Sequence, residues 1–306
     1  MFSCIARATG LLAFIACFAP PAAAPAATLP QIGIADQKHD MFSDPRFADL
    51  GIKHARLAVS WDALRHSRQT AGVDAWMQGA RVRGIDPLIT FNHSRAKSSS
   101  LPSPKQMRRE FRAFRARYPW ATTFATWNET NHCGEKVCHR AKLVATYYRA
   151  LRRECPTCTI LAAEVIDLPS MATWMRAFRR HLGYMPRLWG LHNYVEANRF
   201  KTKRLRQLLR LIGRRGKLWL TETGGVVRRS NNSTTDFPEG ARHAARVTRY
   251  IFDRLVKRNR RIHRVYIYHW NAGPPNTTWD SALITYGGRE RGAFWVLRRV
   301  LRSGLK

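Results

Sequence analysis

Short apolar segments alternate with helical ones along almost the whole chain, and this alternation is the feature that most restricts the fold. Eight segments have the length and composition of strands, at residues 31–35, 54–60, 87–91, 122–127, 159–163, 187–194, 217–222 and 265–270. Helical segments are expected at about residues 41–50, 72–83, 102–118, 139–153, 170–181, 202–214, 239–257 and 289–301. Strands that alternate with helices form parallel βαβ units. Eight such units predict an α/β protein with one (β/α)8 barrel over residues 28–306.

The first 30 residues have a different character. Arg7 is followed by the apolar run 11–18 and then by an Ala/Pro tract, which is the order found in secretory signals. We therefore expect a signal peptide at residues 1–27, cleaved near Ala26 or Ala27, and a secreted, extracellular protein. A membrane span is the weaker interpretation, because prolines interrupt the apolar run well short of ~20 residues. A lipid anchor at Cys17 is another alternative.

Four cysteines lie beyond the predicted signal, in two close pairs: Cys133 with Cys138 and Cys155 with Cys158. Their spacing is compatible with a four-cysteine zinc site. In the predicted barrel, however, the first pair follows the fourth strand and the second pair precedes the fifth, so the pairs lie at opposite ends. Disulfides persist outside the cytoplasm. The sequence therefore predicts two local disulfides.

The chain has 53 Lys and Arg but 20 Asp and Glu, a formal net charge of +33. Such a charge favours polyanionic partners, including acidic polysaccharides, anionic cell-wall polymers, membrane surfaces and nucleic acid. The alternative is that the arginines simply cover the solvated faces of helices. In either case, acidic residues are scarce, and their positions are informative.

Two of these scarce acids stand at predicted strand ends. The fourth strand ends in Trp127, Asn128 and Glu129, and the seventh ends in Glu222. A strand with its helix takes roughly 30 residues in a (β/α)8 barrel, so the two glutamates are about three units apart. Because the carboxyl ends of all barrel strands face one mouth, we expect both carboxylates in one cavity.

The remaining strand ends add hydrogen-bonding and aromatic side chains: Asp36, Trp61, His93, Asp167, His192, Tyr194 and Trp270. This mixture suits a sugar ring, which has polar edges and an apolar face. We expect Trp61, Trp270 and Trp279 to be candidates for stacking on a sugar, and Trp127 and Trp219 to pack inside the protein.

The arrangement resembles that of the clan A glycoside hydrolases, the 4/7 superfamily. In that clan an asparagine precedes the acid/base glutamate at the end of strand four, as in Asn128-Glu129, and the nucleophile ends strand seven, as Glu222 does. The resemblance extends to Arg56, His93, His192, Tyr194 and Trp270. It implies a TIM barrel that hydrolyses β-linked poly- or oligosaccharides with retention, by double displacement.

The resemblance also implies supporting roles. Arg56 and Tyr194 would hold Glu222 ionised, and Asn128 would contact the sugar 2-hydroxyl. The charge of Glu222 would raise the pKa of Glu129, so that Glu129 starts protonated.

Other assignments of these residues stay open. Arg56 could pair with Asp36 or Asp62 instead, and His192 could be a core histidine. Glu164 and Asp167, which follow the fifth strand, lie outside the signature of the clan, as does the basic loop around Arg228 and Arg229. Each of these residues either lines a sugar subsite or belongs to the ordinary surface, and the sequence leaves both alternatives open.

No cofactor or metal is expected, since the sequence has no His-x-His at a strand end and no His-Glu-x-x-His pattern. Two other functions compete with hydrolysis: a catalytically silent sugar-binding barrel, and a basic nucleic-acid-binding protein, for which no recognition motif is present. The sugar, the linkage, endo or exo action and the oligomeric state stay open.

Overall fold

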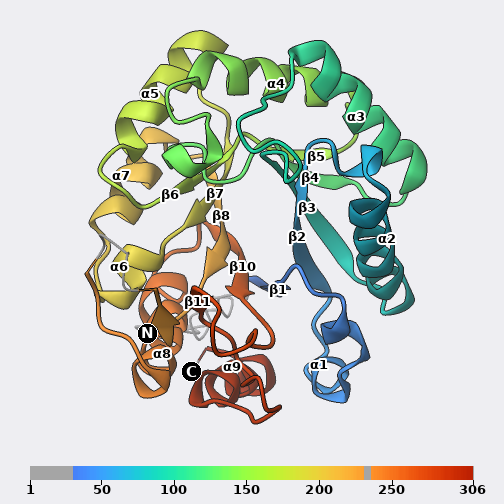
Figure 1. The fold of residues 1–306 in the computed structure, drawn as a ribbon. Coiled ribbons are helices and arrows are strands. Elements are labelled where there is room, and N and C mark those ends of the chain that lie inside the picture. The colour runs from blue at the N-terminus through green and yellow to red at the C-terminus, as the bar shows by residue number, and fades with distance from the viewer. Residues whose placement is uncertain (1–29, 231–235, 306) are drawn as a thin grey trace, which may run out of the picture.

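The computed structural model describes residues 30–230 and 236–305, which form a barrel of parallel strands surrounded by helices (Figure 1). The strands of the barrel are β1 (Gln31–Ala35), β2 (His54–Ser60), β3 (Asp86–Asn92), β4 (Thr123–Ala125), β5 (Thr159–Leu161), β6 (Glu164–Ile166), β7 (Leu188–His192), β8 (Lys217–Thr223) and β10 (Ile262–Tyr268). They follow one another around the barrel in the order β5, β4, β3, β2, β1, β10, β8, β7, β6.

Strands β5 and β6 are two halves of the fifth strand, and they close the barrel. Between them, Ala162 N donates to Leu188 O at 3.0 Å on one side, and Glu164 N donates to Trp127 O at 3.0 Å on the other. The chain from β5 to β6 is therefore bonded to both of its neighbours. The predicted (β/α)8 barrel is confirmed.

Helices cover the outside of the barrel. The longer ones are α2 (Ser67–Val82), α3 (Pro104–Arg117), α4 (Ala141–Glu154), α5 (Met171–Leu182), α7 (Lys203–Leu211), α8 (Ala241–Tyr250) and α9 (Gly292–Ser303). Shorter segments are α1 (Pro45–Asp49), α6 (Tyr194–Asn198), the 3-10 turns η1 (Asp40–Ser43), η2 (Ala63–Arg65) and η3 (Cys133–Glu135), and η4 (Ile251–Val256), a π-helical continuation of α8. Two short strands, β9 (Arg228–Arg229) and β11 (Trp279–Asp280), pair antiparallel outside the barrel.

Some boundaries differ from the sequence prediction. The sixth strand was expected to reach Tyr194, but β7 ends at His192 because Tyr194 begins the short helix α6. The first helix after the second strand begins at Ser67 rather than near residue 72. The basic loop after the seventh strand contains β9, a strand that the sequence did not predict.

The strands separate two apolar regions, as alternating side chains on a barrel require. The larger region lies between the strands and the helices. The smaller one fills the barrel interior with Ala35, Leu88, Ala125, Leu161, Trp219 and Tyr266. Trp219 therefore packs inside the barrel, as predicted, and this layer forms a solid base beneath the polar groups at the mouth.

Both predicted disulfides are present, Cys133 with Cys138 and Cys155 with Cys158. Each ties the two ends of a short loop. None of the helices in the described part of the chain is long and apolar enough to cross a membrane. The predicted signal peptide lies outside the described residues.

Candidate active site

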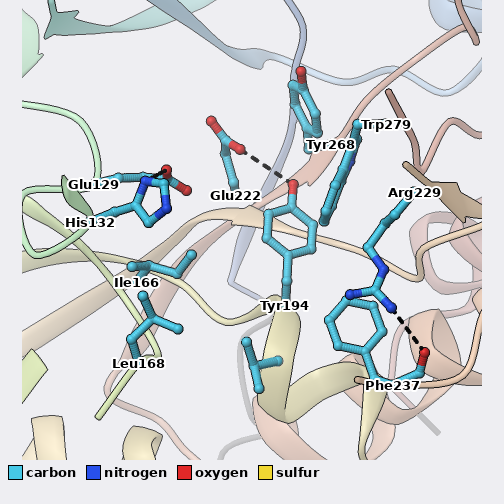
Figure 2. Close-up of a pocket in the computed structure, with 11 residues that line it drawn as sticks. Glu129, His132, Ile166, Leu168, Tyr194, Glu222, Arg229, Phe237, Tyr268 and Trp279 are labelled. Atoms are coloured by element: carbon cyan, nitrogen blue, oxygen red, sulfur yellow. Dashed lines mark hydrogen bonds and ion pairs between the residues drawn. The ribbon is translucent and has the colours of Figure 1, made fainter. Parts of the chain in front are cut away.

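Glu129 and Glu222 lie at the same mouth of the barrel and line one pocket (Figure 2). Glu222 belongs to β8. Glu129 follows β4 and has a φ of +38°, a conformation that costs an L-residue about 1–3 kcal/mol and is common at functional sites. Hydrogen bonds on both sides hold it there, from Asn128 N to Phe91 O at 2.8 Å and from Thr130 N to Glu164 O at 2.9 Å.

The imidazole of His192 lies near both carboxylates and sets an upper limit on the distance between two of their oxygens. Its Nδ1 lies 3.0 Å from Oε1 of Glu129 and 3.8 Å from Oε2 of Glu222. These two oxygens are therefore no more than 6.8 Å apart, the sum of the two distances. Carboxyl groups stand about 5–5.5 Å apart in retaining glycosidases and about 6.5–9.5 Å apart in inverting ones. The limit applies to this pair of oxygens and is compatible with the retaining separation.

Arg56 is fully buried beneath the mouth and joins three side chains. Its Nη1 donates to Oε1 of Glu222 at 2.5 Å, its Nε donates to Oε1 of Glu164 at 2.9 Å, and its Nη2 donates to Oδ1 of Asn128 at 2.8 Å. Arg56 therefore forms ion pairs with Glu164 and Glu222. The alternative partners that the sequence left open, Asp36 and Asp62, are not among its contacts in the described residues.

Glu164, which the sequence left between subsite and surface, is neither. Its side chain is completely buried and accepts hydrogen bonds from Arg56 and from Thr90 Oγ1 at 3.0 Å. Burial alone raises the pKa of Glu164, but the charges and hydrogen bonds of Arg56 and His192 outweigh burial and lower the pKa to about 2. Glu164 is therefore a permanent anion that anchors the cations of the site.

His192 lies among all three carboxylates, and its Nε2 is 3.5 Å from Oε2 of Glu164. Burial lowers the pKa of His192. The carboxylates of Glu222, Glu129 and Glu164 outweigh burial and raise the pKa to about 10. The imidazole is therefore an imidazolium at neutral pH. His192 is buried, but it is not an ordinary core histidine.

The proton of the site consequently lies on His192 rather than on Glu129. Burial raises the pKa of Glu129, but the hydrogen bond and charge of His192, together with His132 and Arg56, lower it below its usual value. From the sequence we expected the pKa of Glu129 to be raised, because we considered the negative charge of Glu222 but not the nearby positive charges. Glu129 and His192 act as a pair that shares one proton.

Tyr194 completes the surroundings of Glu222. Its hydroxyl donates to Oε2 of Glu222 at 3.3 Å (Figure 2). Asp167 positions this tyrosine, because its buried carboxylate accepts the backbone N–H groups of Val195 and Glu196 at the start of α6. Burial raises the pKa of Asp167 to about 7.

Asn128 and His93 are held together by a carboxylate that the sequence did not single out. Glu135, in η3, accepts from Nδ2 of Asn128 at 3.1 Å and lies 3.1 Å from Nδ1 of His93. Since Arg56 donates to the amide oxygen of Asn128, both ends of this amide have partners within the protein. His93 remains partly exposed beside it.

The pocket has a volume of about 480 Å³. Its lining comprises Glu129, His132, Ile166, Leu168, Tyr194, Val195, Glu222, Arg229, Phe237, Tyr268 and Trp279. The rings of Tyr268 and Trp279 both pack against Tyr194, whose hydroxyl points to Glu222 (Figure 2). Trp279 packs edge-on against Tyr194, with ring centroids 5.0 Å apart, and the pairing of β11 with β9 holds it in place.

The structure corrects the roles expected for two tryptophans. Trp270 is completely buried between Phe47 and Phe294, and its indole Nε1 donates to Asp44. Trp61 is 5% exposed and belongs to the outer core. Neither offers a face to a sugar. Tyr268, two residues before Trp270, is the aromatic residue of the eighth strand that reaches the pocket.

Arg56 and His192 need a related correction. We expected both to bind substrate, but both side chains are completely buried. Their contacts are with Asn128 and with the carboxylates of Glu129, Glu164 and Glu222. They therefore position these groups and do not line the pocket.

Arg229, in the basic loop that the sequence left between subsite and surface, lines the pocket. Several other pocket residues escaped the sequence reasoning, namely His132, Phe237, Tyr268 and the apolar group Ile166, Leu168 and Val195. Tyr268 carried a signal, because its place at the end of a strand could have nominated it. The others lie in loops or short segments, where nothing in the sequence indicates which side chains turn towards the mouth.

No protein-family model matches the sequence, and no curated protein matches it at a significant level. Solved structures do match. A GH10 protein from Paenibacillus barcinonensis has a TM-score of 0.64 and 13% identity, over 90% of this chain and 96% of its own. A glucosidase from Croceicoccus marinus has a TM-score of 0.65 and 12% identity, over 90% and 68% of the two chains.

The chain shares the TIM-barrel fold of these solved structures. A family 39 glycoside hydrolase from Bacteroides cellulosilyticus WH2 agrees, with a TM-score of 0.57 and 15% identity over 91% of this chain and 64% of its own. The resemblance inferred from the strand ends is thus confirmed at the level of the fold.

Proposed function

We propose that the protein is a retaining glycoside hydrolase that acts on β-linked poly- or oligosaccharides outside the cytoplasm. The observation that carries the proposal is the placement of two carboxylates from different strands, Glu129 and Glu222, around one imidazole nitrogen and in one pocket. The aromatic rings of Tyr268 and Trp279 beside them suit the apolar face of a sugar.

In the first step, a carboxylate oxygen of Glu222 attacks the anomeric carbon and forms an ester with the sugar. Arg56 and Tyr194 orient Glu222 for this attack and stabilise its charge. The bond from the anomeric carbon to the leaving oxygen breaks, and that oxygen receives a proton from Glu129. We infer that this proton comes from the pair formed by Glu129 and His192.

In the second step, water attacks the anomeric carbon, and the ester bond to Glu222 breaks. Glu129 takes a proton from this water and the pair returns to its initial state. Two displacements at the same carbon give a product with the configuration of the substrate.

The test uses aryl β-glycosides with good and poor leaving groups. Glu222→Gln is expected to abolish hydrolysis of both. Glu129→Gln is expected to lower kcat/KM, which reports the first step, by roughly 10²–10⁴-fold for the poor leaving group and much less for the good one, because a good leaving group does not need the proton.

Proton NMR of the first product distinguishes retention from inversion in the wild type. A first product with inverted configuration contradicts the proposed mechanism. Sugar binding without turnover by the wild-type protein contradicts the enzymatic proposal and favours the sugar-binding alternative.

A further inference from the structure

A groove with three arginines lies on the outside of the barrel, between α7 and the α8–η4 helix, and shares no lining residue with the pocket of Glu129 and Glu222. Its volume is about 410 Å³. The groove is lined by Thr202, Leu205, Arg206, Tyr250, Arg254, Leu255, Arg258 and Asn259. In this lining, three guanidinium groups are accompanied by hydroxyl and amide donors, and no carboxylate is present.

The three arginines come from two segments of the chain and line the same groove. Arg206 belongs to α7, Arg254 belongs to η4, and Arg258 follows η4. All three lie close enough to the hydroxyl of Tyr250 to lower its pKa electrostatically, although burial and Glu196 raise it overall. Tyr250 is itself held in place by an edge contact with Phe200, at 5.2 Å between ring centroids.

In a second basic groove of the protein, an arginine is paired with a carboxylate of the same groove. There Arg117 lies with Arg81, and the carboxylate of Asp74 accepts two hydrogen bonds from Arg117, at 2.7 and 2.6 Å. In the groove between α7 and η4, by contrast, the side chains of Arg206, Arg254 and Arg258 have no acidic partner among the described residues.

Two acids lie near the groove, but neither forms an ion pair with its three arginines among the described residues. Glu196 uses both carboxylate oxygens to accept the N–H groups of Arg204 and Leu205, at 2.7 and 3.0 Å, and thereby caps α7. Asp253 is an exposed residue of η4 that is not part of the groove lining. The three positive charges therefore exceed the negative charge close to the groove, and no carboxylate is part of its lining.

We propose that this groove is a binding site for a phosphate group. A guanidinium donates two parallel hydrogen bonds to a phosphate, and three guanidiniums with Tyr250 and Asn259 surround such an anion with more donors than a planar carboxylate can use. Buried Leu205 and Leu255 form an apolar base beneath these donors. The phosphate is either the free ion or part of an anionic polymer.

The experiment measures binding of inorganic phosphate to the full chain by titration calorimetry, in a buffer free of other oxyanions. In one variant Arg206, Arg254 and Arg258 are replaced together by Gln, and we expect its Kd to rise about tenfold or more. In the matched control Arg176, Arg179 and Arg180 of α5 are replaced by Gln. These residues are exposed, the net charge changes equally, and we expect wild-type binding.

Thermal unfolding provides a second readout. Without phosphate, the groove variant is expected to melt at the wild-type temperature or above it, because the excess of positive charge at the groove is reduced. With phosphate, the wild type and the control gain stability and the groove variant does not. Equal phosphate effects on all three proteins would refute the site, as would equal losses of binding in the two variants, since both outcomes indicate a response to net charge alone.

A further arm identifies the source of the phosphate. A poly(glycerol phosphate) chain that binds the wild type more tightly, per phosphate, than the free ion does, with the difference lost in the groove variant, indicates a polymer ligand. Equal affinities indicate the free ion.

Discussion

His192 is the residue that sets where the proton of the candidate site lies. It contacts Glu129, Glu164 and Glu222 from the centre of the barrel mouth. The pKa of His192 in the folded protein, about 10, is above its ordinary value of 6.5. The contacts of the protonated imidazole therefore stabilise the fold fully below about pH 6.5, and this stabilisation is lost as the pH rises through 10.

Replacing His192 by Gln is expected to move the alkaline limb of the kcat/KM profile to lower pH. In the wild type, the pair formed by His192 and Glu129 keeps its proton until the pH approaches the raised pKa of His192. In the variant only a carboxyl group remains to carry the proton, and it ionises at a lower pH. The measurement is the pH profile of hydrolysis of a substrate with a poor leaving group.

Tyr194→Phe is the control for this profile. It removes the hydroxyl that donates to Glu222 but leaves His192, His132 and Arg56 near Glu129. We expect a lower kcat with the alkaline limb in the wild-type position. If His192→Gln also keeps the wild-type limb, Glu129 does not share its proton with His192.

At the scale of elements, the close approach of β6 and β7 makes room for the buried anion. Gly190 of β7 is in register with Glu164 of β6. A Cβ at position 190 would lie 2.6 Å from Cγ of Glu164 and 2.8 Å from Oγ1 of Thr221, nearer than van der Waals contact allows. The absence of a side chain here thus lets Glu164 lie inside the barrel and bind Arg56.

Gly190→Ala is expected to destabilise the protein by about 1–3 kcal/mol, because it overpacks a buried site. It should also lower kcat on the order of 10²-fold, since a displaced Glu164 shifts Arg56 and with it Glu222. Chemical denaturation and steady-state kinetics measure the two effects.

The matched control is Gly72→Ala in α2, where a Cβ meets nothing within 4 Å. This change is expected to stabilise the helix by about 0.5–1 kcal/mol and to leave kcat unchanged. Equal behaviour of the two variants would show that the space at residue 190 is not what positions Glu164.

At the scale of the whole molecule, the excess of positive charge opposes the compact state. The chain has 53 basic and 20 acidic residues, and several of the acids are used in buried networks such as that of Arg56. Repulsion among the surface arginines is therefore the main long-range electrostatic effect on stability, and it lowers the free energy of unfolding.

We expect sodium chloride to raise the melting temperature. Added salt shortens the screening length from ~30 Å at 0.01 M to ~10 Å at 0.1 M, which weakens the repulsion between distant arginines more than the contacts inside the barrel. Calorimetry over this range measures the effect. A melting temperature that falls with salt would show that surface ion pairs outweigh the repulsion.

The positions of the strands, and the two glutamates at their ends, could be read from the sequence because these signals are local. A run of apolar residues that ends in Asn128 and Glu129, or in Glu222, marks a strand tip without knowledge of its neighbours. Once eight strands are recognised, barrel symmetry places all their tips at one mouth. The barrel, its two local disulfides and the shared pocket of the two glutamates follow from this reasoning.

Whether a side chain next to a strand end turns towards the mouth or the core was decided by tertiary contacts. Trp270 turns to the core because Asp36 accepts its backbone N–H and Asp44 accepts its indole N–H. Glu164 turns inward because Gly190 leaves space for it. The proton lies on His192 because three carboxylates from different strands meet around it. Each of these results depends on groups remote in sequence, and the free energy of a buried charge is set by the neighbours that the fold brings to it.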